Sequence, residues 1–357
     1  MNKKIRVIVI GCGNMGASHA RAYYKLEGFE LVGLVDRNPG KRNILAEELG
    51  NPAQFDDFDT ALKTIKPDAV SICTFPETHA EFTIKALEFG AHVFCEKPLA
   101  PNIEDAQAMV DAANKYGKKL VIGYILRVHP SWKRFIEIAQ GLGKPLVMRM
   151  NLNQQSSGKT WHTHRRIMES MSPIVDCGVH YVDVMCLMTR SKPISVSTIG
   201  ARLSDEIDAD MYNYGQLQVR FEDGSVGWYE AGWGPMMSEV AFFVKDVIGP
   251  KGCVNIMDAE QGSDKGSDDI DSHTKTNRLK VHYADKDDND EFTRPDEIIN
   301  MEDEPNHQGL CDLEQEYFLN AINEDIDLTN HLTDAVNSLK IVLAADASFR
   351  TGKTIDL

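Results

Sequence analysis

The stretch Ile5-Arg6-Val7-Ile8-Val9-Ile10-Gly11-Cys12-Gly13-Asn14-Met15-Gly16 decides the fold of this chain. Its apolar part, Ile5 to Ile10, is typical of a buried parallel strand, and the glycines that follow open a helix. In a Gly-x-Gly-x-x-Gly turn of this kind, Gly11 allows the tight turn and Gly13 lets a pyrophosphate approach the backbone. Gly16 lets helix and strand pack closely. The stretch therefore predicts a strand, turn and helix that bind a dinucleotide.

The residues around this turn indicate which dinucleotide is bound. Amides at the helix start, including those of Asn14 and Met15, are expected to hold the phosphates. Asp36 ends the second predicted strand, 20 residues after Gly16, where a carboxylate accepts hydrogen bonds from both ribose hydroxyls and repels a 2′-phosphate. NAD is favoured for this reason, although Arg37 can accept a phosphate and leaves NADP open. The alternative for Asp36 is a turn former at the strand end.

The first 124 residues alternate short β-branched runs with helix-period stretches, which predicts a doubly wound α/β domain with a parallel sheet over residues 1–124. The predicted strands are 5–10, 30–35, 69–73, 92–95 and 120–122, and the predicted helices are 14–26, 40–49, 77–89 and 103–116.

Residues 125–357 change character and are predicted to form a second α/β domain. Alternating segments indicate antiparallel strands, and Glu222-Asp223-Gly224 indicates a hairpin turn. The expected strands are 146–154, 194–203, 214–221 and 225–231, and the expected helices are 130–141, 173–188, 310–322 and 332–349.

Charge and cysteine content exclude several classes of partner. The net charge is −16, of which the segment 258–304, with 16 acidic and 6 basic residues, holds −10; this argues against nucleic acid and against anionic membrane surfaces. The segment is expected to be a long solvated loop, with an acidic docking patch as the alternative. No apolar run reaches the roughly 20 residues of a membrane span. Seven cysteines without a Cys-x-x-Cys pair fit reduced thiols in the cytoplasm.

Two loops at the ends of predicted parallel strands face the crevice in which open α/β sheets bind ligands. One contains Thr74-Phe75-Pro76 and the other Glu96-Lys97-Pro98. Lys97 is thus expected beside the nicotinamide, where an ammonium can orient or deprotonate a substrate hydroxyl. An exposed strand-end lysine is the simpler interpretation, but Pro98 restricts the conformation of Lys97 and Glu96 offers it a partner.

A helix start in the second domain carries a second group of candidates. Ser172 as the cap and Pro173 at the first helical position place Asp176 and His180 on one face. The carboxylate can fix the tautomer of the imidazole, which then serves as the base for a hydroxyl proton. Gly178 costs this helix roughly 1 kcal/mol relative to alanine, which indicates a close approach to its backbone. The alternative is a solvated helix pair.

Other histidines and carboxylates have weaker interpretations. Asp183 is an alternative but less favoured partner of His180, and His19 is expected to pack the start of the first helix rather than to catalyse. His162 and His164 are close in sequence, but with His180 they show no ligand pattern typical of a zinc site. No metal is therefore predicted.

Taken together, these motifs resemble the Gfo/Idh/MocA oxidoreductases, which include inositol dehydrogenases and glucose–fructose oxidoreductase. The resemblance covers most of the chain, and the Glu-Lys-Pro signature is its most specific part. The motifs that carry it are Gly11-x-Gly13-x-x-Gly16-x-x-His19, Thr74-x-Pro76 with His79, Glu96-Lys97-Pro98 and Asp176-x-x-x-His180.

The resemblance implies a Rossmann domain followed by an α/β domain with a large open, mainly antiparallel sheet, and assembly into dimers or tetramers through that sheet. It implies that Lys97 and His180 act at the reacting hydroxyl and that Asp176 assists. It adds Thr74, Pro76, His79, Glu96 and Lys97 to the cofactor contacts, and it places Arg127, Trp161 and His162 in the sugar pocket.

The predicted function is NAD(P)-dependent hydride transfer to or from a secondary hydroxyl of a sugar, cyclitol or sugar derivative. The alternatives are an NAD-dependent glycosidase that oxidises its substrate transiently, and a regulator that senses a dinucleotide or sugar without turnover. The chain departs from the family pattern at 169–173, where a glycine-rich run is common, and in the acidic segment 258–304. Both departures leave the substrate open.

Overall fold

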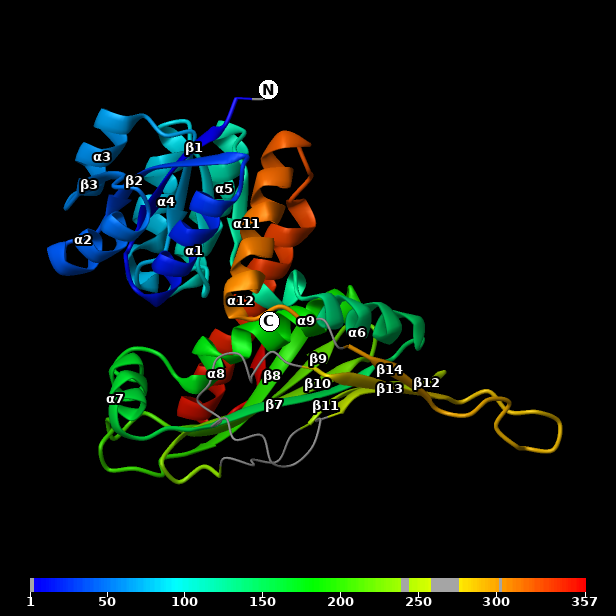
Figure 1. Cartoon of the computed structure of the whole chain (residues 1–357). Helices are drawn as coiled ribbons and strands as arrows, with labels where there is room; N and C mark the ends of the chain where they lie inside the picture. The colour runs from blue at the N-terminus through cyan, green and yellow to red at the C-terminus, as the bar shows by residue number, and fades with distance from the viewer. Residues whose placement is uncertain (1–2, 239–243, 258–275, 302–303) are drawn as a thin grey trace. The chain divides into compact units, whose positions relative to one another are not determined.

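The computed structural model describes residues 3–238, 244–257, 276–301 and 304–357. The chain forms two compact units (Figure 1). The first contains Met1–Val128 and Pro305–Val336, and the second contains His129–Glu304 and Asn337–Leu357.

The first unit is built on a six-stranded parallel sheet with the order β3-β2-β1-β4-β5-β6. This is the doubly wound arrangement predicted from the glycine turn, and its order reverses between β1 and β4, where such sheets bind ligands. The strands are β1 (Ile5–Ile10), β2 (Phe29–Val35), β3 (Ala53–Phe55), β4 (Ala69–Ile72), β5 (His92–Cys95) and β6 (Leu120–Ile122).

Helices cover this sheet and give it a closely packed core. The predicted helices are all present, while β3 and the helix α3 were not predicted. The helices that follow the strands are α1 (Asn14–Lys25), α2 (Pro39–Glu48), α3 (Phe58–Ile65), η1 (Pro76–Thr78), α4 (His79–Glu88), α5 (Ile103–Tyr116) and η2 (Ile125–Arg127).

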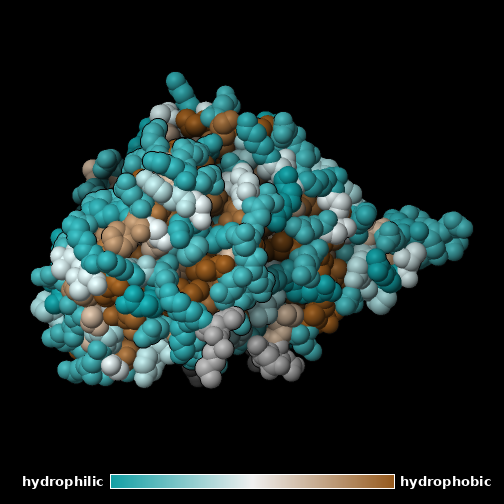
Figure 2. All heavy atoms as spheres, turned by 90° about the horizontal axis from the view of Figure 1, so that it is seen from above, coloured by the Kyte–Doolittle hydropathy of each residue, from teal (hydrophilic) through white to brown (hydrophobic). Residues whose placement is uncertain are grey.

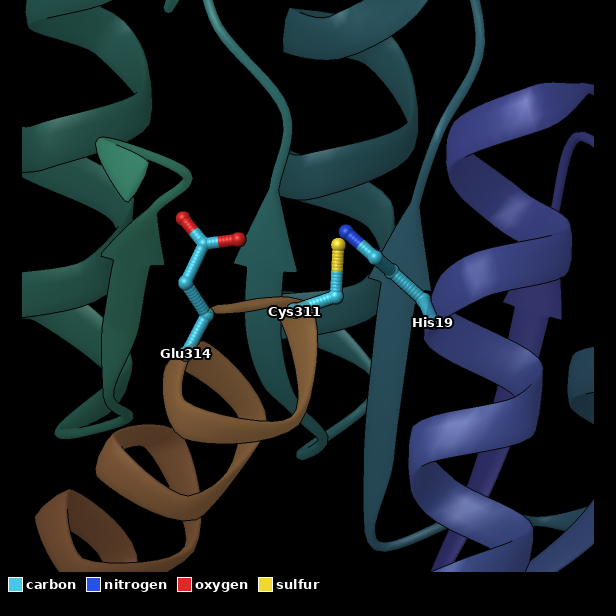
Figure 3. Close-up of side chains that lie close together, drawn as sticks. All are labelled: His19, Cys311 and Glu314. Atoms are coloured by element: carbon cyan, nitrogen blue, oxygen red, sulfur yellow. The ribbon is translucent and has the colours of Figure 1, made fainter. Parts of the chain in front are cut away.

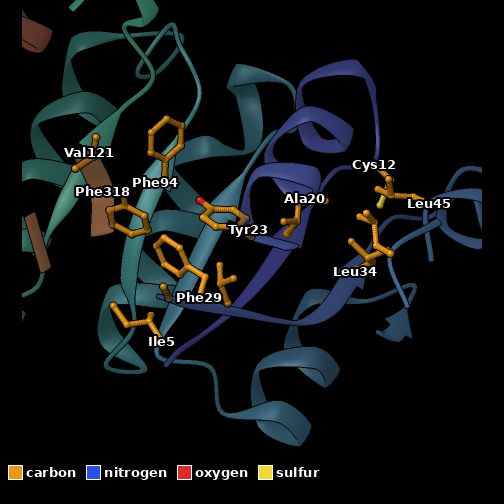
Figure 4. Packing of buried hydrophobic residues seen from close by; sticks show 14 of the residues in the cluster. Ile5, Cys12, Ala20, Tyr23, Phe29, Leu34, Leu45, Phe94, Val121 and Phe318 are labelled. Atoms are coloured by element: carbon orange, nitrogen blue, oxygen red, sulfur yellow. The ribbon is translucent and has the colours of Figure 1, made fainter. Parts of the chain in front are cut away.

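The tail of the chain completes this core. Phe318, from α11 (His307–Asn323), is fully buried, and its ring centroid lies 6.1 Å from that of Phe29 and 5.9 Å from that of Phe94 (Figure 4). The sequence placed residues 305–336 in the second domain with the rest of the tail, whereas the structure packs them with the first unit. The reason is that the apolar face of α11 is buried against α1 and the sheet.

The second unit contains a nine-stranded sheet with the order β14-β13-β12-β11-β7-β10-β9-β8-β15. Every neighbouring pair is antiparallel except β7 and β10, so the predicted large, mainly antiparallel sheet is confirmed. The strands are β7 (Val147–Gln155), β8 (Pro193–Ala201), β9 (Tyr214–Phe221), β10 (Val226–Gly234), β11 (Lys245–Gly249), β12 (Gly252–Met257), β13 (Arg278–Tyr283), β14 (Glu297–Asn300) and β15 (Ile355–Asp356).

Helices α6 (Pro130–Gly141), α8 (Pro173–Asp176) and α9 (Gly178–Thr189) pack on one face of this sheet (Figure 1). The predicted helix 173–188 is therefore divided at Cys177, although Cys177 keeps helical backbone angles. The other helices among the residues that the structure describes are α7 (Gly158–Ile167) and α12 (Thr329–Thr351). None of the helices among the described residues is long and apolar enough to cross a bilayer.

The expectation of one long loop over 258–304 is wrong for the part that the structure describes. Strands β13 and β14 pair there and extend the sheet, because Leu279 and Val281 alternate inward with polar neighbours. Residues 258–275 and 302–303 lie outside the described residues. Between the two strands, residues 284–296 project from the sheet (Figure 1), and the face of this projection seen in Figure 2 is mostly hydrophilic.

Candidate functional site

The three glycines of the first turn have different surroundings. A Cβ atom added to Gly11, whose φ is +88°, would lie 2.5 Å from the carbonyl oxygen of Cys73, and one added to Gly16 would lie 1.7 Å from the carbonyl oxygen of Gly11. A Cβ atom on Gly13 would meet nothing within 4 Å. Gly11 and Gly16 therefore serve the packing of the turn, while the space above Gly13 stays open for a ligand.

The start of α1 fits an anionic group. The helices α2, α3 and α5 are each capped by a side chain, that of Asn38, Asp57 or Asn102 respectively. Helix α1 has no side-chain cap and no acidic residue in its first turn, and Asn14 is exposed. Its first amides are thus left for the phosphates of a dinucleotide, which fits the cofactor predicted from the sequence.

Asp36, which was predicted to bind the ribose, also holds the turn in place. Its Oδ2 accepts a hydrogen bond from the amide of Cys12 at 2.7 Å, and its Oδ1 accepts one from the amide of Asn38 at 2.8 Å. Each carboxylate oxygen can accept a second hydrogen bond, so these contacts leave capacity for ribose hydroxyls. Arg37 is exposed.

His79 joins the two loops at the carboxyl ends of β4 and β5. Its Nε2 lies 3.1 Å from the carbonyl oxygen of Thr74, and its Nδ1 lies 3.0 Å from that of Pro98. Because burial lowers the pKa of His79, the ring is neutral and donates to one of these carbonyls. His79 and Pro76 are buried, and the two contacts of His79 hold the loops together.

The two charged residues of the Glu-Lys-Pro signature differ in burial. Glu96 is 6% exposed and its Oε1 lies 3.1 Å from Nε2 of His19, while its Oε2 accepts a hydrogen bond from the amide of Lys97 at 3.2 Å. Lys97 is the one residue between Val93 and Ala100 that is not buried. This loop therefore buries the Glu96 carboxylate, and Lys97 is its one residue that is not buried.

Two contacts tie Arg127 to α12 within the first unit. It lies 3.1 Å from Nδ1 of His331 and 3.4 Å from a carboxylate oxygen of Asp334, both on α12. These contacts give it a structural task besides the sugar contact that the resemblance implies.

In the second unit, a buried group of polar side chains fixes the start of α8. Ser172 accepts a hydrogen bond from the amide of Val175 at 3.2 Å and donates one to Asp346 at 2.7 Å. Tyr212 donates to the same oxygen of Asp346 at 2.5 Å. Burial raises the pKa of Asp346. Neither Tyr212 nor Asp346 was predicted, because each is distant in sequence from Ser172.

Asp176 and His180 lie on either side of the division between α8 and α9, and both are half-buried. The thiol of Cys177 lies 3.6 Å from Oδ2 of Asp176 and 3.6 Å from Oε1 of Gln154, which also accepts a 2.7 Å hydrogen bond from the indole of Trp233. Gln154 and Trp233 are neighbours that sequence reasoning missed, since each lies on a strand with no motif of its own. Asp183 is fully buried.

The close approach expected at Gly178 is made by an aromatic ring. A Cβ atom on Gly178 would lie 2.9 Å from Cε1 of Tyr229, and the Tyr229 ring stacks on Tyr181 with centroids 4.8 Å apart. Gly178 therefore lets the helix that carries His180 pack directly on β10.

Helix α7 carries two of the predicted sugar-pocket residues in different environments. Trp161 is buried and donates a 3.1 Å hydrogen bond to Glu206. His162 is exposed and lines a pocket of about 260 Å³ together with Arg165, Arg166, Met168, Glu169, Glu206, Ile207 and Asp208.

The structure brings together a group of potential metal ligands that differs from the histidines considered in the sequence. Among the described residues, the group of three potential ligands is His19, Cys311 and Glu314, all in the first unit. His164 instead stacks on Trp233 with ring centroids 4.3 Å apart.

Comparison with known proteins covers both units. Residues 5–124 match the model of the oxidoreductase family with an NAD-binding Rossmann fold, and residues 134–252 match the Gfo/Idh/MocA C-terminal domain. D-glucoside 3-dehydrogenase of Escherichia coli (strain K12) is 28% identical over 281 residues, which span 74% of this chain and 80% of that protein. An NAD⁺-dependent scyllo-inositol 2-dehydrogenase of Bacillus subtilis (strain 168) is 28% identical over 240 residues, or 65% of this chain and 68% of the relative.

Solved structures share the fold over the whole chain. The myo-inositol 2-dehydrogenase of Lactobacillus plantarum superposes with a TM-score of 0.78 at 22% identity, covering 99% of this chain and 100% of that one. A scyllo-inositol dehydrogenase of Lactobacillus casei, with bound NAD(H) and scyllo-inositol, gives 0.77 at 21% identity, with 99% of each chain covered. Since two models of one family together match about two thirds of the chain, this protein belongs to the Gfo/Idh/MocA oxidoreductase family.

Proposed function

We propose that this protein is an NAD-dependent dehydrogenase that oxidises or forms a secondary hydroxyl of a sugar, cyclitol or sugar derivative. The observation that carries the proposal is Lys97, the single unburied residue of a buried turn at the carboxyl end of β5, in the same unit as the open glycine turn. The names of the relatives support the substrate class, because they act on glucosides and inositols.

Each candidate residue has a distinct task in this proposal. Bound NAD would supply the hydride acceptor, held by the amides above Gly13 and by Asp36. The Lys97 ammonium orients the substrate oxygen and stabilises negative charge on it. His180 takes the hydroxyl proton while the C–H bond breaks and the carbonyl forms, and Asp176 favours the charged imidazole. Arg127, Trp161 and His162 are proposed to line the sugar pocket.

Two alanine substitutions test the catalytic assignment. Lys97→Ala and His180→Ala should each lower turnover by at least about two orders of magnitude while calorimetry still detects NAD binding. Lys115→Ala, at an exposed lysine of α5, is the matched control and should retain turnover. Full activity in both test variants would reject the assignment.

A substrate panel identifies the compound class. Myo-inositol, scyllo-inositol and simple glucosides, assayed for NADH absorbance, should give turnover with at least one of them. Release of an aglycone without net NADH would instead indicate the glycosidase, and NAD binding without turnover of any compound would indicate a sensor.

Asp36 is proposed to discriminate NAD from NADP. The Asp36→Ala variant should improve the use of NADP relative to NAD, because it removes the carboxylate that repels a 2′-phosphate. Unchanged preference would remove Asp36 from the site.

We also propose that the chain forms a dimer or tetramer in the cytoplasm. The exposed side chains of Val147, Val226 and Ile248 lie side by side on β7, β10 and β11, since Val147 is paired with both of the others. Exposed apolar patches of this kind are typical of interfaces. Light scattering should give twice or four times the mass of one chain, and Val226→Lys should shift it towards the monomer.

A further inference from the structure

A cluster of polar side chains lies inside the first unit, behind the Glu96-Lys97-Pro98 turn. His19 comes from α1, and Cys311 and Glu314 extend from the same face of α11 (Figure 3). Glu96 follows β5. Their exposed fractions are 0% for His19, 6% for Glu96, 0% for Cys311 and 3% for Glu314. Ionisable groups are seldom buried so completely unless they share protons or pair with one another.

Contacts lead from His19 to the backbone of Lys97. Nδ1 of His19 lies 3.0 Å from Oγ of Ser71 and 3.1 Å from Sγ of Cys73. Its Nε2 lies 3.1 Å from Oε1 of Glu96, an ion-pair distance without hydrogen-bond alignment. The other oxygen of Glu96 accepts the hydrogen bond from the Lys97 amide. The orientation of the Glu96 carboxylate therefore sets where the Lys97 turn is held.

Glu314 adds a second carboxyl group to this buried site. A carboxylate oxygen of Glu314, the sulfur of Cys311 and a ring nitrogen of His19 all lie within 4.8 Å of one another, and Oε1 of Glu314 is buried without a hydrogen-bond partner. Burial, and secondly the charge of Glu96, raises the pKa of Glu314 well above its usual range. This shift favours the protonated form of Glu314, which can donate a hydrogen bond.

The contacts favour a proton-sharing cluster over a metal site. Nδ1 of His19 is engaged by Ser71 and Cys73, and Nε2 faces Glu96, so an ion would have to displace an existing contact.

We propose that His19 and Glu314 are positioning residues, which share protons with Glu96 and so fix the turn that presents Lys97. The inference rests on the proposed function, because it assigns these residues to the reaction through Lys97. A displacement of about 1 Å at a reacting group can cost on the order of a hundredfold in rate. Such a positioning role explains why the protein buries a polar cluster that costs it stability.

Two substitutions of Glu314 test the proposal. Leucine removes the acid but fills similar space, and removal of a buried ionisable group by an apolar one often leaves stability unchanged or higher. Glu314→Leu should therefore keep or raise Tm while kcat falls at least about tenfold and the KM for NAD changes less than about threefold. Glu314→Gln, which like the neutral acid can donate a hydrogen bond, should keep kcat within about threefold of the parent.

The matched control is Glu316→Leu, the same change on the exposed side of the same helix, which should alter neither kcat nor KM. Wild-type kcat in Glu314→Leu would overturn the proposal. So would equal losses of kcat and Tm in the leucine and glutamine variants, because they would indicate packing alone. One equivalent of bound metal in the purified protein, measured by elemental analysis, would replace the proton-sharing cluster with a metal site.

Lys97→Ala separates this inference from the proposed function. If Lys97→Ala is inactive and Glu314→Leu is fully active, the positioning role fails and the function stands. If Lys97→Ala retains full turnover, the proposed function fails first, whatever Glu314→Leu shows.

Discussion

At Gly13 and Gly16 a single added methyl group has opposite consequences. The methyl of Gly13→Ala points into open space, whereas that of Gly16→Ala would overlap the carbonyl oxygen of Gly11. The backbone of Gly13 is extended, with φ −77° and ψ −164°, so alanine fits it without strain. We expect Gly13→Ala to change the free energy of unfolding by less than about 1 kcal/mol while it weakens NAD binding at least about tenfold, because the pyrophosphate loses its approach to the backbone.

Calorimetric titration with NAD and urea denaturation check both halves of this prediction. Gly16→Ala is the contrasting variant and should fail to give a folded protein. Unchanged NAD affinity in Gly13→Ala would place the dinucleotide elsewhere.

Three histidines of the first unit predict how stability depends on pH; His79 and His331 are buried and His92 is half-buried. Burial lowers the pKa of His79, His92 and His331, that of His92 to about 4. In the unfolded chain each of these histidines binds a proton near pH 6.5. Below that pH the unfolded state therefore binds protons that the folded state does not bind. The contribution of these histidines to the free energy of unfolding is fully present above pH 6.5, and it is lost as the pH falls from 6.5 towards 4.

The variant His92→Gln isolates one of these histidines, because glutamine can still accept the 3.0 Å hydrogen bond from the Lys119 amide. Urea titrations between pH 7 and 4.5 should show that the free energy of unfolding falls less steeply with decreasing pH in the variant. The difference in slope should correspond to up to about one bound proton. Parallel curves would mean that His92 is protonated in the folded protein.

The sequence located the candidate residues but could not orient all of them. Lys97 and Glu96 are adjacent in a loop, where no periodicity tells which side chain turns inward. Glu96 lies buried against His19, and its charge acts on Glu314, which lies more than 200 residues later in the chain. Such a partner follows from the three-dimensional packing of α11, which no local pattern encodes.

At the scale of single elements, the first residue of helix α9 is Gly178, where the Tyr229 ring leaves no room for a side chain. Alanine normally stabilises a helix by up to about 1 kcal/mol relative to glycine, but overpacking a core costs about 1–3 kcal/mol. Gly178→Ala should therefore lower the free energy of unfolding and lower kcat as well, since it moves the helix that carries His180.

Gly141→Ala is the matched control, because Gly141 ends α6 in the same unit and a Cβ atom there meets nothing within 4 Å. It should keep or raise stability in urea denaturation. A gain of stability in both variants would show that Tyr229 moves aside without cost.

The elements that the sequence predicted well are those with a strong burial pattern. Every residue of β4 is buried, so its apolar run was unmistakable. Strand β3 has no buried residue and spans three residues, and it forms only because β2 offers it an edge. Strands β13 and β14 were missed for a similar reason: β14 is largely exposed and both lie in a strongly acidic segment. Their pairing is decided by the neighbouring strand β12.

At the scale of the whole molecule, the first unit is assembled from two separate pieces of chain, Met1–Val128 and Pro305–Val336. The second piece supplies Phe318 to the aromatic core and Gln315, which accepts a 2.5 Å hydrogen bond from Tyr23. Removing one buried phenylalanine side chain costs about 3–5 kcal/mol, while a whole domain is stable by only about 5–15 kcal/mol. The first piece alone should not reach a stable fold.

A fusion of residues 1–128 to 305–336 through a short Gly/Ser linker should fold and bind NAD, whereas residues 1–128 alone should not. A short linker suffices because Ser131 and Glu304, just beyond the two ends, are hydrogen-bonded to each other. Circular dichroism melting and NAD calorimetry should give the fusion one cooperative transition and measurable binding. The same fusion with Phe318→Asp is the matched control and should behave like the isolated first piece, since it keeps the chain length and linker but places a charge in the aromatic core. Equal melting of the fusion and of residues 1–128 would show that α11 only covers a unit that is complete without it.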